Sequence, residues 1–518
     1  MKKNKFMVLG MSAIALALIL AFAGCVTVPS GVDAAEAAAQ LAAEFNAIIP
    51  GIAEVDGVTV TLTNRIWFQW SGEGDAIFMD GRREVSEGLW IKSFSLTVPA
   101  GVTLDVTADD AGLYLGNMTL TVDGTVNARG NGGLGFEDNT SEAIVNGSGT
   151  INLTGKGSLF IDNGKKLILD GVTLVGVADN DESLVWVGEG GEFILKSGAI
   201  TGNSGAGAGG GVGVEGTFTM EGGEISGNNV MYAGGVYVMA AGTFTMTGGI
   251  ISGNTAQEES GGVRLDGGTF IMTGGEISGN ISIGVEEEWS GGGGVDLRDE
   301  ASFTMSGGII SGNSAGNSTG GGVKVTEGCT FTMTGGEISG NTAGGGGGVV
   351  IYDGTFTMTG GEISGNTAGG SGGGVSMAWG ATFTMEGGEI SGNRVQGGDK
   401  GGGVFVGWES TFNMYGGAIY GNSVQGSEMA FGGGVMLDGA TSFTMFGGRI
   451  QGGTESDGYA ANAVTASIAS GAALNVGEPT ARWGTGGTYT RGGEPQTGGS
   501  IILAQYGTDD TLIAIPAP

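Results

Sequence analysis

The sequence predicts an all-β chain that forms a right-handed parallel β-helix (a solenoid) with a short N-terminal helix and a C-terminal cap. A phrase close to GTFTMTGGEISGN, which occupies residues 354–366, recurs ten times along the chain. Glycine supplies 115 of the 518 residues without a three-residue period, which excludes collagen and indicates frequent tight turns. The apolar fraction of 40% is too high for a disordered chain, so the repeats must bury a core.

The first 24 residues are typical of an export signal, because three lysines precede an apolar run over 6–24. The run ends in FAGC at residues 22–25, which resembles the lipobox of bacterial lipoproteins. This resemblance implies cleavage before Cys25 and a lipid on that cysteine. An uncleaved helix across the membrane is the alternative. We therefore expect attachment to a membrane through the N-terminal lipid.

Charge and residue usage exclude several functions. The chain has 53 acidic and 20 basic residues, a net charge of −33, so it repels nucleic acid and we expect none as a partner. It has no histidine, the commonest metal ligand and acid–base group. We predict no metal, no cofactor and no catalytic residue. Cys329 is the second of two cysteines, so with Cys25 lipidated no intrachain disulfide can form.

Residues 25–50 are expected to form a tether and a helix. The Ala-rich segment 33–47 favours the helix, with Asp33 as its N-cap, and this helix is expected to cover the exposed edge of the first coil. Residues 51–192 alternate apolar and polar side chains and turn on glycine, which predicts irregular coils of the same solenoid.

Residues 193–453 hold the regular repeats, each aligned on a phenylalanine. Met or Leu follows two residues later, Ile seven residues later, and Asn ten residues later in nine copies. Gly-Gly-Val stands before nine of the phenylalanines. The ten phenylalanines are Phe193, Phe218, Phe244, Phe270, Phe303, Phe331, Phe356, Phe383, Phe412 and Phe443.

Each repeat is expected to hold three short strands, because its apolar residues alternate in Val-x-Val and Phe-x-Met and recur around Ile. Stacked repeats would place like residues on each other at about 4.8 Å per coil. The parallel crossover rule predicts right-handed coils. Repeat length varies between Asn and the next Gly-Gly-Val, which locates the variable loops there. Residues 454–518 lose the repeat and are expected to form the cap and tail.

The pairing of Ile-x-x-Asn with Gly-Gly-Val, as at 225–228 and 234–236, resembles the repeats of polymorphic outer-membrane proteins. The column of asparagines is similar to that of pectate-lyase-like β-helices. The first resemblance implies a surface or envelope β-helix, often an adhesin. Proteins of that kind usually carry Phe where this chain has Ile. They also usually end in a barrel, which we do not expect from the last residues of this sequence.

Polysaccharide cleavage is the enzymatic alternative that the second resemblance raises. The basic residues of the repeats fall on different copies, so we expect no catalytic cluster among them: Lys196, Arg264, Arg298, Lys324, Arg394, Lys400 and Arg449. The segment GGGGVD at 291–296 matches the start of a calcium-binding repeat only once and is interpreted as a turn. Glu337, Glu362 and Glu389 share one outward position, where solvation is the simplest interpretation.

Threonines flank most of the phenylalanines and would form two outward columns. This pattern resembles the threonine array of β-helical ice-binding proteins, which makes ice binding a second alternative. The strand propensity of threonine explains the pattern equally well.

The predicted function is a non-catalytic, lipid-anchored envelope protein that presents an adhesive surface to an unknown protein or glycan. Val26 after the cysteine favours the outer membrane, on its outer or periplasmic side. The two longest connections between Asn and Gly-Gly-Val are the candidate binding loops, because variable loops on a rigid scaffold commonly carry function. Their candidate contact residues are Glu286, Glu287, Glu288, Trp289, Met429 and Phe431.

Overall fold

The computed structural model shows an all-β parallel β-solenoid of about 11 turns with one short N-terminal helix, as the sequence predicts. The structure describes residues 33–48, 53–62, 66–71, 74–79, 94–107, 113–115, 118–129, 134–136, 141–153, 157–161, 164–284, 291–316, 318–398, 400–425, 433–438, 441–445, 448–450, 465–467, 473–476, 489–491, 494–496 and 511–513. It divides into two compact units, Met1–Gly205 with Gly216–Glu224 and Ala206–Glu215 with Ile225–Pro518.

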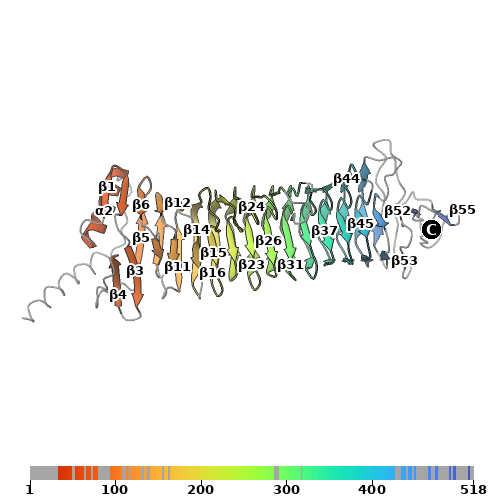
Figure 1. The fold of residues 1–518 in the computed structure, drawn as a ribbon, viewed down its shortest axis with the longest axis horizontal. Coiled ribbons are helices and arrows are strands. Elements are labelled where there is room, and N and C mark those ends of the chain that lie inside the picture. The colour runs from red at the N-terminus through yellow and green to blue at the C-terminus, as the bar shows by residue number, and fades with distance from the viewer. Residues whose placement is uncertain are drawn as a thin grey trace, which may run out of the picture. The chain divides into compact units, whose positions relative to one another are not determined.

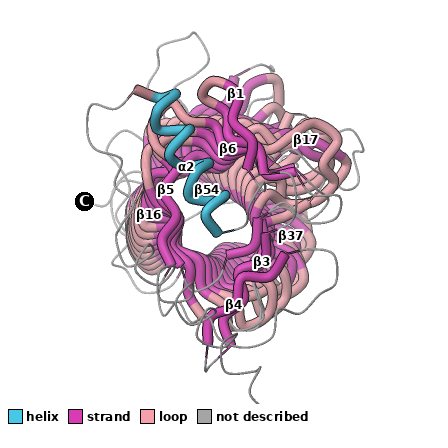
Figure 2. The backbone as a smooth tube through the Cα atoms, turned by 90° about the vertical axis from the view of Figure 1, so that its left-hand side faces the viewer, coloured by secondary structure: helices cyan, strands magenta, loops and turns pink. Residues whose placement is uncertain are grey.

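The first unit begins with helix α2 (Ala34–Ile48), where Asp33 is the predicted N-cap: its carboxylate accepts a 2.9 Å hydrogen bond from the amide of Glu36. Apolar residues on one face of α2 are buried, and the helix packs on β1 and β2, near β5 and β6 in Figure 2. Asn46 joins the helix to β1 through two hydrogen bonds with the backbone of Ala53. Within the described ranges, no helix has the length and apolar character needed to cross a membrane.

The remaining strands of the first unit form the irregular coils. β1 and β2 form an antiparallel hairpin, as do β3 and β4, and β2 then pairs in parallel with β6. Parallel ladders continue through β6, β9, β12 and β14, and through β5, β8, β11, β14, β16 and β19. The strands are β1 (Ala53–Asp56), β2 (Thr59–Leu62), β3 (Ile66–Ser71), β4 (Gly74–Met79), β5 (Phe94–Val98), β6 (Thr103–Thr107), β7 (Leu113–Leu115), β8 (Met118–Val122), β9 (Thr125–Arg129), β10 (Leu134–Phe136), β11 (Glu142–Asn146), β12 (Thr150–Leu153), β13 (Leu159–Ile161), β14 (Lys166–Val175), β15 (Val185–Val187), β16 (Glu192–Thr201), β17 (Ser204–Gly205) and β19 (Thr217–Met220).

The second unit has the three predicted strands in each regular coil. Figure 1 shows the strands of successive coils side by side from β23 to β45. The Val-x-Val strands are β18 (Val212–Val214), β22 (Val236–Val238), β26 (Val263–Asp266), β30 (Val295–Arg298), β33 (Val323–Val325), β37 (Val349–Tyr352), β41 (Val375–Ala378), β45 (Val404–Gly407) and β49 (Val435–Asp438). The Phe-x-Met strands are β23 (Thr243–Met246), β27 (Thr269–Met272), β31 (Ser302–Met305), β34 (Thr330–Met333), β38 (Thr355–Met358), β42 (Thr382–Met385), β46 (Thr411–Met414) and β50 (Ser442–Met445).

The third strand of each coil is centred on isoleucine. These strands are β24 (Ile250–Ser252), β28 (Glu276–Ser278), β32 (Ile309–Ser311), β35 (Glu337–Ser339), β39 (Glu362–Ser364), β43 (Glu389–Ser391), β47 (Ala418–Tyr420) and β51 (Arg449–Ile450), with β20 (Glu224–Ser226) at the division between the units. Beyond residue 450 lie β52 (Thr465–Ser467), β53 (Ala473–Val476), β54 (Tyr489–Arg491), β55 (Glu494–Gln496) and β56 (Thr511–Ile513). β53 pairs in parallel with β50, so the ladder reaches into the range predicted as the cap.

The core of the second unit is built from columns of identical side chains. Phe356 pairs in register with Phe331 on one side and Phe383 on the other, and the ring centroids lie 4.6 and 4.8 Å apart. All the repeat phenylalanines are fully buried, as are the isoleucines seven residues after them. Each coil therefore depends on its neighbours to remove its apolar face from water.

Glycine is required where coils approach most closely. A Cβ on Gly348, just before β37, would lie 2.6 Å from the carbonyl oxygen of Gly374 and 2.8 Å from Cγ2 of Ile363. Gly361 has a positive φ of 89°, and a Cβ there would lie 2.6 Å from Cε of Met333. The repeated Gly-Gly pairs thus serve coil-to-coil contact as well as turning.

Asparagines form a buried ladder along the second unit. The side-chain amide of Asn366 donates to Oδ1 of Asn393 at 2.9 Å and to the carbonyl oxygen of Ile338 at 2.9 Å. Its own oxygen accepts from the backbone and side-chain nitrogens of Asn341 at 2.9 and 3.0 Å. The same pattern links the ladder residues Asn228, Asn254, Asn280, Asn313, Asn341, Asn366, Asn393 and Asn422. The ladder satisfies backbone groups at the bend after the isoleucine strand.

A fourth short strand follows the asparagine, a feature that the sequence analysis did not predict. The ladder holds the backbone in register, so that the amide of Thr255 donates to the carbonyl oxygen of Asn228 at 2.8 Å. These strands are β21 (Asn229–Val230), β25 (Thr255–Ala256), β29 (Ile281–Ser282), β36 (Thr342–Ala343), β40 (Thr367–Ala368), β44 (Arg394–Gln396) and β48 (Ser423–Gln425). The connection predicted as a variable loop is therefore partly regular structure.

Replacing Asn366 with alanine tests the ladder. The change leaves buried partners on both neighbouring coils without their hydrogen bonds, and each such group costs about 1–3 kcal/mol. We expect the free energy of unfolding to fall by about 3 kcal/mol in urea denaturation followed by circular dichroism. Thr355→Ala, at an exposed position of the same coil, should stay within about 0.5 kcal/mol of the wild type. Equal stability of both variants would contradict a supporting role for the ladder.

Candidate functional site

Tight turns link the Val-x-Val strands to the Phe-x-Met strands, and aromatic side chains lie in two of them, at Trp379 and Trp408, and at the start of a third, at Tyr352. Trp379 and Trp408 lie in left-handed backbone conformations, with φ of 58° and 41°. Left-handed residues recur in these turns in other coils, as glycine at Gly267 and Gly328 and as acidic residues at Asp299 and Glu300. A residue other than glycine in this conformation costs about 1 kcal/mol, so these turns carry tryptophan against the backbone preference.

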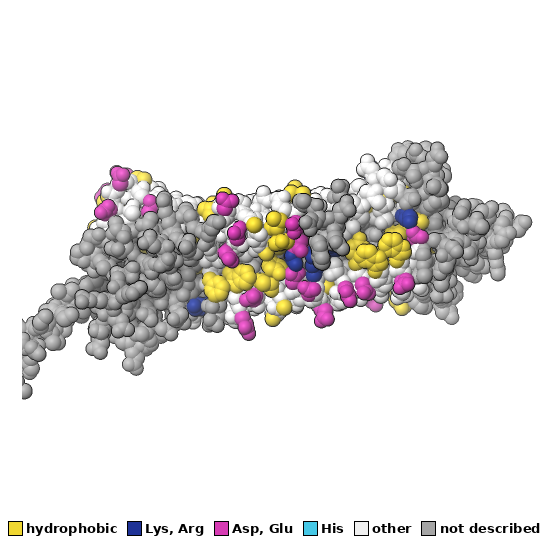
Figure 3. All heavy atoms as spheres, in the orientation of Figure 1, with side chains coloured by type: hydrophobic (Ala, Val, Ile, Leu, Met, Phe, Trp, Pro, Cys, Tyr) yellow, Lys and Arg dark blue, Asp and Glu magenta, His cyan; other side chains and the backbone are white. Residues whose placement is uncertain are grey.

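The aromatic side chains of these turns form a row across three successive coils. We call Tyr352, Trp379 and Trp408 the aromatic row. The ring centroids of Tyr352 and Trp379 lie 4.6 Å apart, and those of Trp379 and Trp408 lie 6.0 Å apart with ring planes inclined by 18°. Trp379 is 57% exposed and Trp408 is 59% exposed, whereas Tyr352 is half-buried. Figure 3 shows hydrophobic side chains gathered over the coils of β37 to β45.

Backbone hydrogen bonds hold the turns of the row at the spacing of the coils. The amide of Asp353 donates to the carbonyl oxygen of Ala378 at 3.3 Å, and that of Gly380 donates to the carbonyl oxygen of Trp408 at 3.1 Å. The amide of Trp408 donates in turn to the backbone carbonyl oxygen of Asp438 at 3.2 Å. The row is therefore part of the ladder of coils and does not sit on a free loop.

Polar groups border the aromatic row. The exposed residues Asp353 and Glu409 directly follow Tyr352 and Trp408 in the chain. At the end nearest β49, Lys400 forms an ion pair with Asp438 at 2.5 Å, and its ammonium lies 5.7 Å from the ring centroid of Phe405. Burial raises the pKa of the Tyr352 phenol, although a hydrogen bond with Thr319 opposes the shift, so this phenol is neutral at physiological pH.

A second cluster of functional groups is a network of ion pairs on the outward side of the Val-x-Val strands. Arg298 contacts Asp296 at 2.9 Å and Glu259 at 3.0 Å, and Glu259 also pairs with Arg264. Arg264 forms two hydrogen bonds with Asp266 and lies 5.2 Å over the ring of Tyr237. Figure 3 shows Lys and Arg side chains among Asp and Glu side chains on this face.

Burial and pairing shift the pKa values of this network. Burial lowers the pKa of Arg298, but Asp296 and its hydrogen bond outweigh this effect and raise the value above normal. Burial lowers the pKa of Lys324, and the carboxylate of Asp296 in the adjacent strand opposes the shift. Burial also raises the pKa of Tyr237 to about 12, together with its hydrogen bond to Asp266. Asp296 is fully buried, and the side chains of Arg264 and Arg298 are only 14% exposed, so most of the network is shielded from water.

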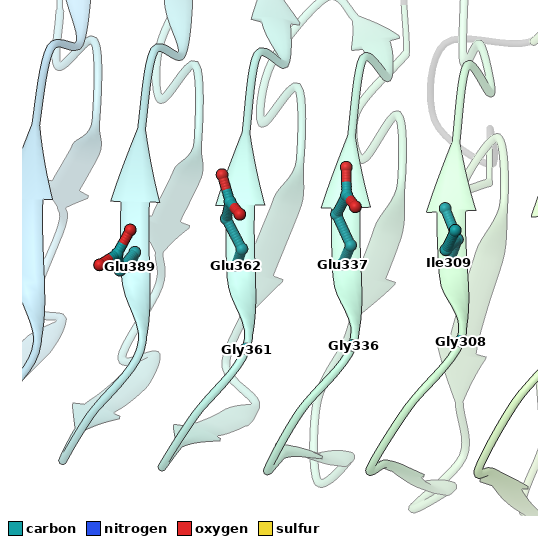
Figure 4. Close-up of a pocket in the computed structure, with 7 residues that line it drawn as sticks. All are labelled: Gly308, Ile309, Gly336, Glu337, Gly361, Glu362 and Glu389. Carbon is teal, nitrogen blue, oxygen red and sulfur yellow. The ribbon is translucent and has the colours of Figure 1, made fainter.

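The outward glutamates line a shallow groove of about 460 Å³ on the isoleucine strands. Figure 4 shows Glu337, Glu362 and Glu389 on successive strands, with Ile309 on the strand before that of Glu337. Glu389 accepts a 2.7 Å hydrogen bond from the hydroxyl of Tyr420, which raises the pKa of that phenol. No group of three or more metal-ligating side chains occurs among the residues that the structure describes.

The predicted threonine columns are present in the second unit. Thr330, Thr355 and Thr382 stand in register, and the second column on the same strands continues through Thr384 to Asn413. Ile271 interrupts this second column earlier in the unit. Many of these threonines are only half-exposed, and ice binding stays a prediction.

The candidate loop residues predicted from the sequence lie outside the described residues. This holds for Glu286, Glu287, Glu288 and Trp289, for Met429 and Phe431, and for Cys25 with the export signal.

The segment GGGGVD lies partly in β30, where Asp296 pairs with Arg298. Cys329 is a buried free thiol whose pKa is raised by burial, which disfavours the reactive thiolate.

Two clusters were missed by the sequence analysis. The basic residues were treated as scattered, yet in-register pairing brings Arg264, Asp296 and Lys324 into one column. The aromatic row could have been found from the sequence by aligning the repeats. An aromatic residue stands four positions before the phenylalanine in three successive copies, at Tyr352, Trp379 and Trp408.

No family model, no curated protein and no solved structure matches this chain.

Replacing Asp296 with alanine tests the ion network. The change removes the buried carboxylate that faces Lys324 and pairs with Arg298, which then keeps only Glu259. Breaking a buried pair in this way costs about 3–5 kcal/mol. We expect a loss of about 3 kcal/mol in the free energy of unfolding, measured by urea denaturation. Glu386→Ala removes the same charge from an exposed position and should change stability by less than about 0.5 kcal/mol. A matching small effect for Asp296→Ala would show that the network adds little to stability.

Proposed function

We propose that this chain is a non-catalytic β-solenoid of the bacterial cell envelope that presents an adhesive or interaction surface. The aromatic row carries the proposal, because two indoles are more than half exposed on a hydrogen-bonded scaffold. Rigid aromatic side chains with a polar border are the usual anchors of binding surfaces. The repeat phenylalanines, by contrast, are fully buried. The difference supports a role for the row in contact with a partner.

The ionisable groups support a non-catalytic role. Arg264 and Arg298 form ion pairs with the buried carboxylates of Glu259 and Asp296. Glu362 and Glu389 in the shallow groove accept hydrogen bonds from the hydroxyls of Ser391 and Tyr420. Strongly perturbed groups can mark catalytic sites, but structural ion pairs perturb them as well. In this proposal the chain uses no cofactor, no metal and no catalytic residue.

The N-terminal sequence supports the location. In this proposal the export signal is cleaved, Cys25 carries a lipid, and Val26 directs the protein to the outer membrane. The resemblance of the repeats to polymorphic outer-membrane proteins also favours a surface β-helix that acts in adhesion. The net charge of −33 makes a protein or glycan a better partner than nucleic acid.

Labelling with a radioactive fatty acid tests the anchor. Bacteria that express the full chain should incorporate label into the wild-type protein, and Cys25→Ala should abolish incorporation because the acylated sulfur is gone. Cys329→Ala is the matched control, since Cys329 is buried in the solenoid and should not affect labelling. Unchanged labelling of Cys25→Ala, or an unlabelled wild type, counts against lipid anchoring.

Adhesion of protein-coated beads tests the interaction surface. Beads carrying the full chain are incubated with intact cells and with surfaces coated with collagen, fibronectin or mucin. The double variant Trp379→Ala/Trp408→Ala should lower the bound fraction by about tenfold or more, because truncation of aromatic anchors commonly costs over 1 kcal/mol each. Tyr415→Ala removes another aromatic side chain, which is 51% exposed, and should bind like the wild type. The proposal fails if the row variant and the wild type bind equally.

A further inference from the structure

We propose that the aromatic row binds an extended neutral polysaccharide, whose sugar rings lie on Trp379 and Trp408 and whose hydroxyl groups donate to Asp353 and Glu409. The chain of sugars would run along the row, across the coils of β37, β41 and β45. This inference rests on the proposed function, because it takes the row as the interaction surface and names the class of its ligand.

The exposed ring surfaces suit a sugar. The centroids of Trp379 and Trp408 lie 6.0 Å apart, which exceeds the contact distance of about 4 Å between fully stacked rings. The two indoles therefore overlap only in part, and more than half of each side chain stays in contact with water. A pyranose ring has an apolar C–H face that loses water when it packs on an indole. Its hydroxyl groups point from the ring edge and need polar partners.

The border of the row supplies those partners. Asp353 and Glu409 are exposed, and Oδ1 of Asp353 lies 3.3 Å from the position of a Cβ on Gly380, the residue after Trp379. The carboxylate thus stands beside the turn that carries the first indole. Ionised carboxylates accept hydrogen bonds from hydroxyl groups and form stronger bonds than neutral acceptors. Apolar rings with acceptors beside them match a sugar chain on both its face and its edge.

Charge selects a neutral ligand. The carboxylates at the row and the net charge of −33 repel polyanions, so uronic-acid polymers and single-stranded nucleic acid are poor ligands despite the capacity of bases to stack. A protein partner usually buries about 800 Å² on each side around a dry core. The row is one side chain wide and bordered by carboxylates, which fits a linear polymer better than a protein face.

The row is also organised before binding. Trp379 and Trp408 have left-handed backbone conformations, and hydrogen bonds join their turns to the neighbouring coils. Binding therefore orders few torsion angles, which lowers its entropic cost. Successive coils place the aromatic side chains of the row along one direction, as a linear polymer places its sugars along one direction.

Calorimetric titration of the full chain in detergent with neutral oligosaccharides tests the inference. The probes are cello-oligosaccharides, laminari-oligosaccharides and manno-oligosaccharides of increasing length, with polygalacturonate and single-stranded DNA as polyanions. We expect at least one neutral series to bind, with an affinity that rises with chain length and changes little with salt. Trp379→Ala and Trp408→Ala should each weaken binding about tenfold, and Trp408→Phe should restore most of it.

Matched variants separate the possible outcomes. Tyr415→Ala should bind as the wild type does, and Asp353→Asn with Glu409→Gln should weaken binding several-fold while circular dichroism stays unchanged. If no neutral series binds but bead adhesion still requires the tryptophans, the glycan assignment is wrong and the proposed function stands. If neither assay depends on the tryptophans, both are wrong. Preferential binding of a polyanion would overturn the assignment as well.

Discussion

Parallel pairing in register is the constraint on which the rest of this structure depends. Because each strand pairs with its equivalent in the next coil, every side chain faces a neighbour at about 4.8 Å that occupies the same position of the repeat. A residue type that packs well against an identical residue at this distance can therefore occupy the same position in every coil. Phenylalanine does so through ring contact, and asparagine does so because it both donates and accepts hydrogen bonds.

Charged residues obey the same constraint in a different way. Like charges directly opposite each other repel, so a partly buried charged column must alternate in sign. The column formed by Arg264, Asp296 and Lys324 on three successive strands alternates in sign in this way. The outward glutamates do not alternate, and they line a groove that is open to water. Burial thus decides which charged columns need partners and which can stay hydrated.

The fold could be predicted because its signals lie within one repeat. The two-residue alternation of Phe-x-Met and the fixed distances to Ile and Asn identify inward positions without any knowledge of the neighbouring coil. The candidate site could not be predicted in the same way. Trp379 and Trp408 are turn residues outside the strand pattern, and their meeting depends on the register of coils whose lengths differ. The ion network was missed for the same reason, since its members are distant in the chain. The fourth strand was too short, at two or three residues, for alternation to reveal it.

The identical columns also affect the pairing of coils during folding. A coil that pairs with the wrong neighbour would still place Phe on Phe, Ile on Ile and Asn on Asn, so the core distinguishes poorly between correct and shifted arrangements. Only residues that differ between coils can distinguish the correct arrangement from a shifted one. A shift by one coil would set Arg264 against Lys324 in place of Asp296, and would leave Asp296 without its cationic neighbour. The buried charges therefore favour the correct register of the coils over shifted registers in an otherwise repetitive molecule. Specifying register is the role in which buried polar groups are best attested.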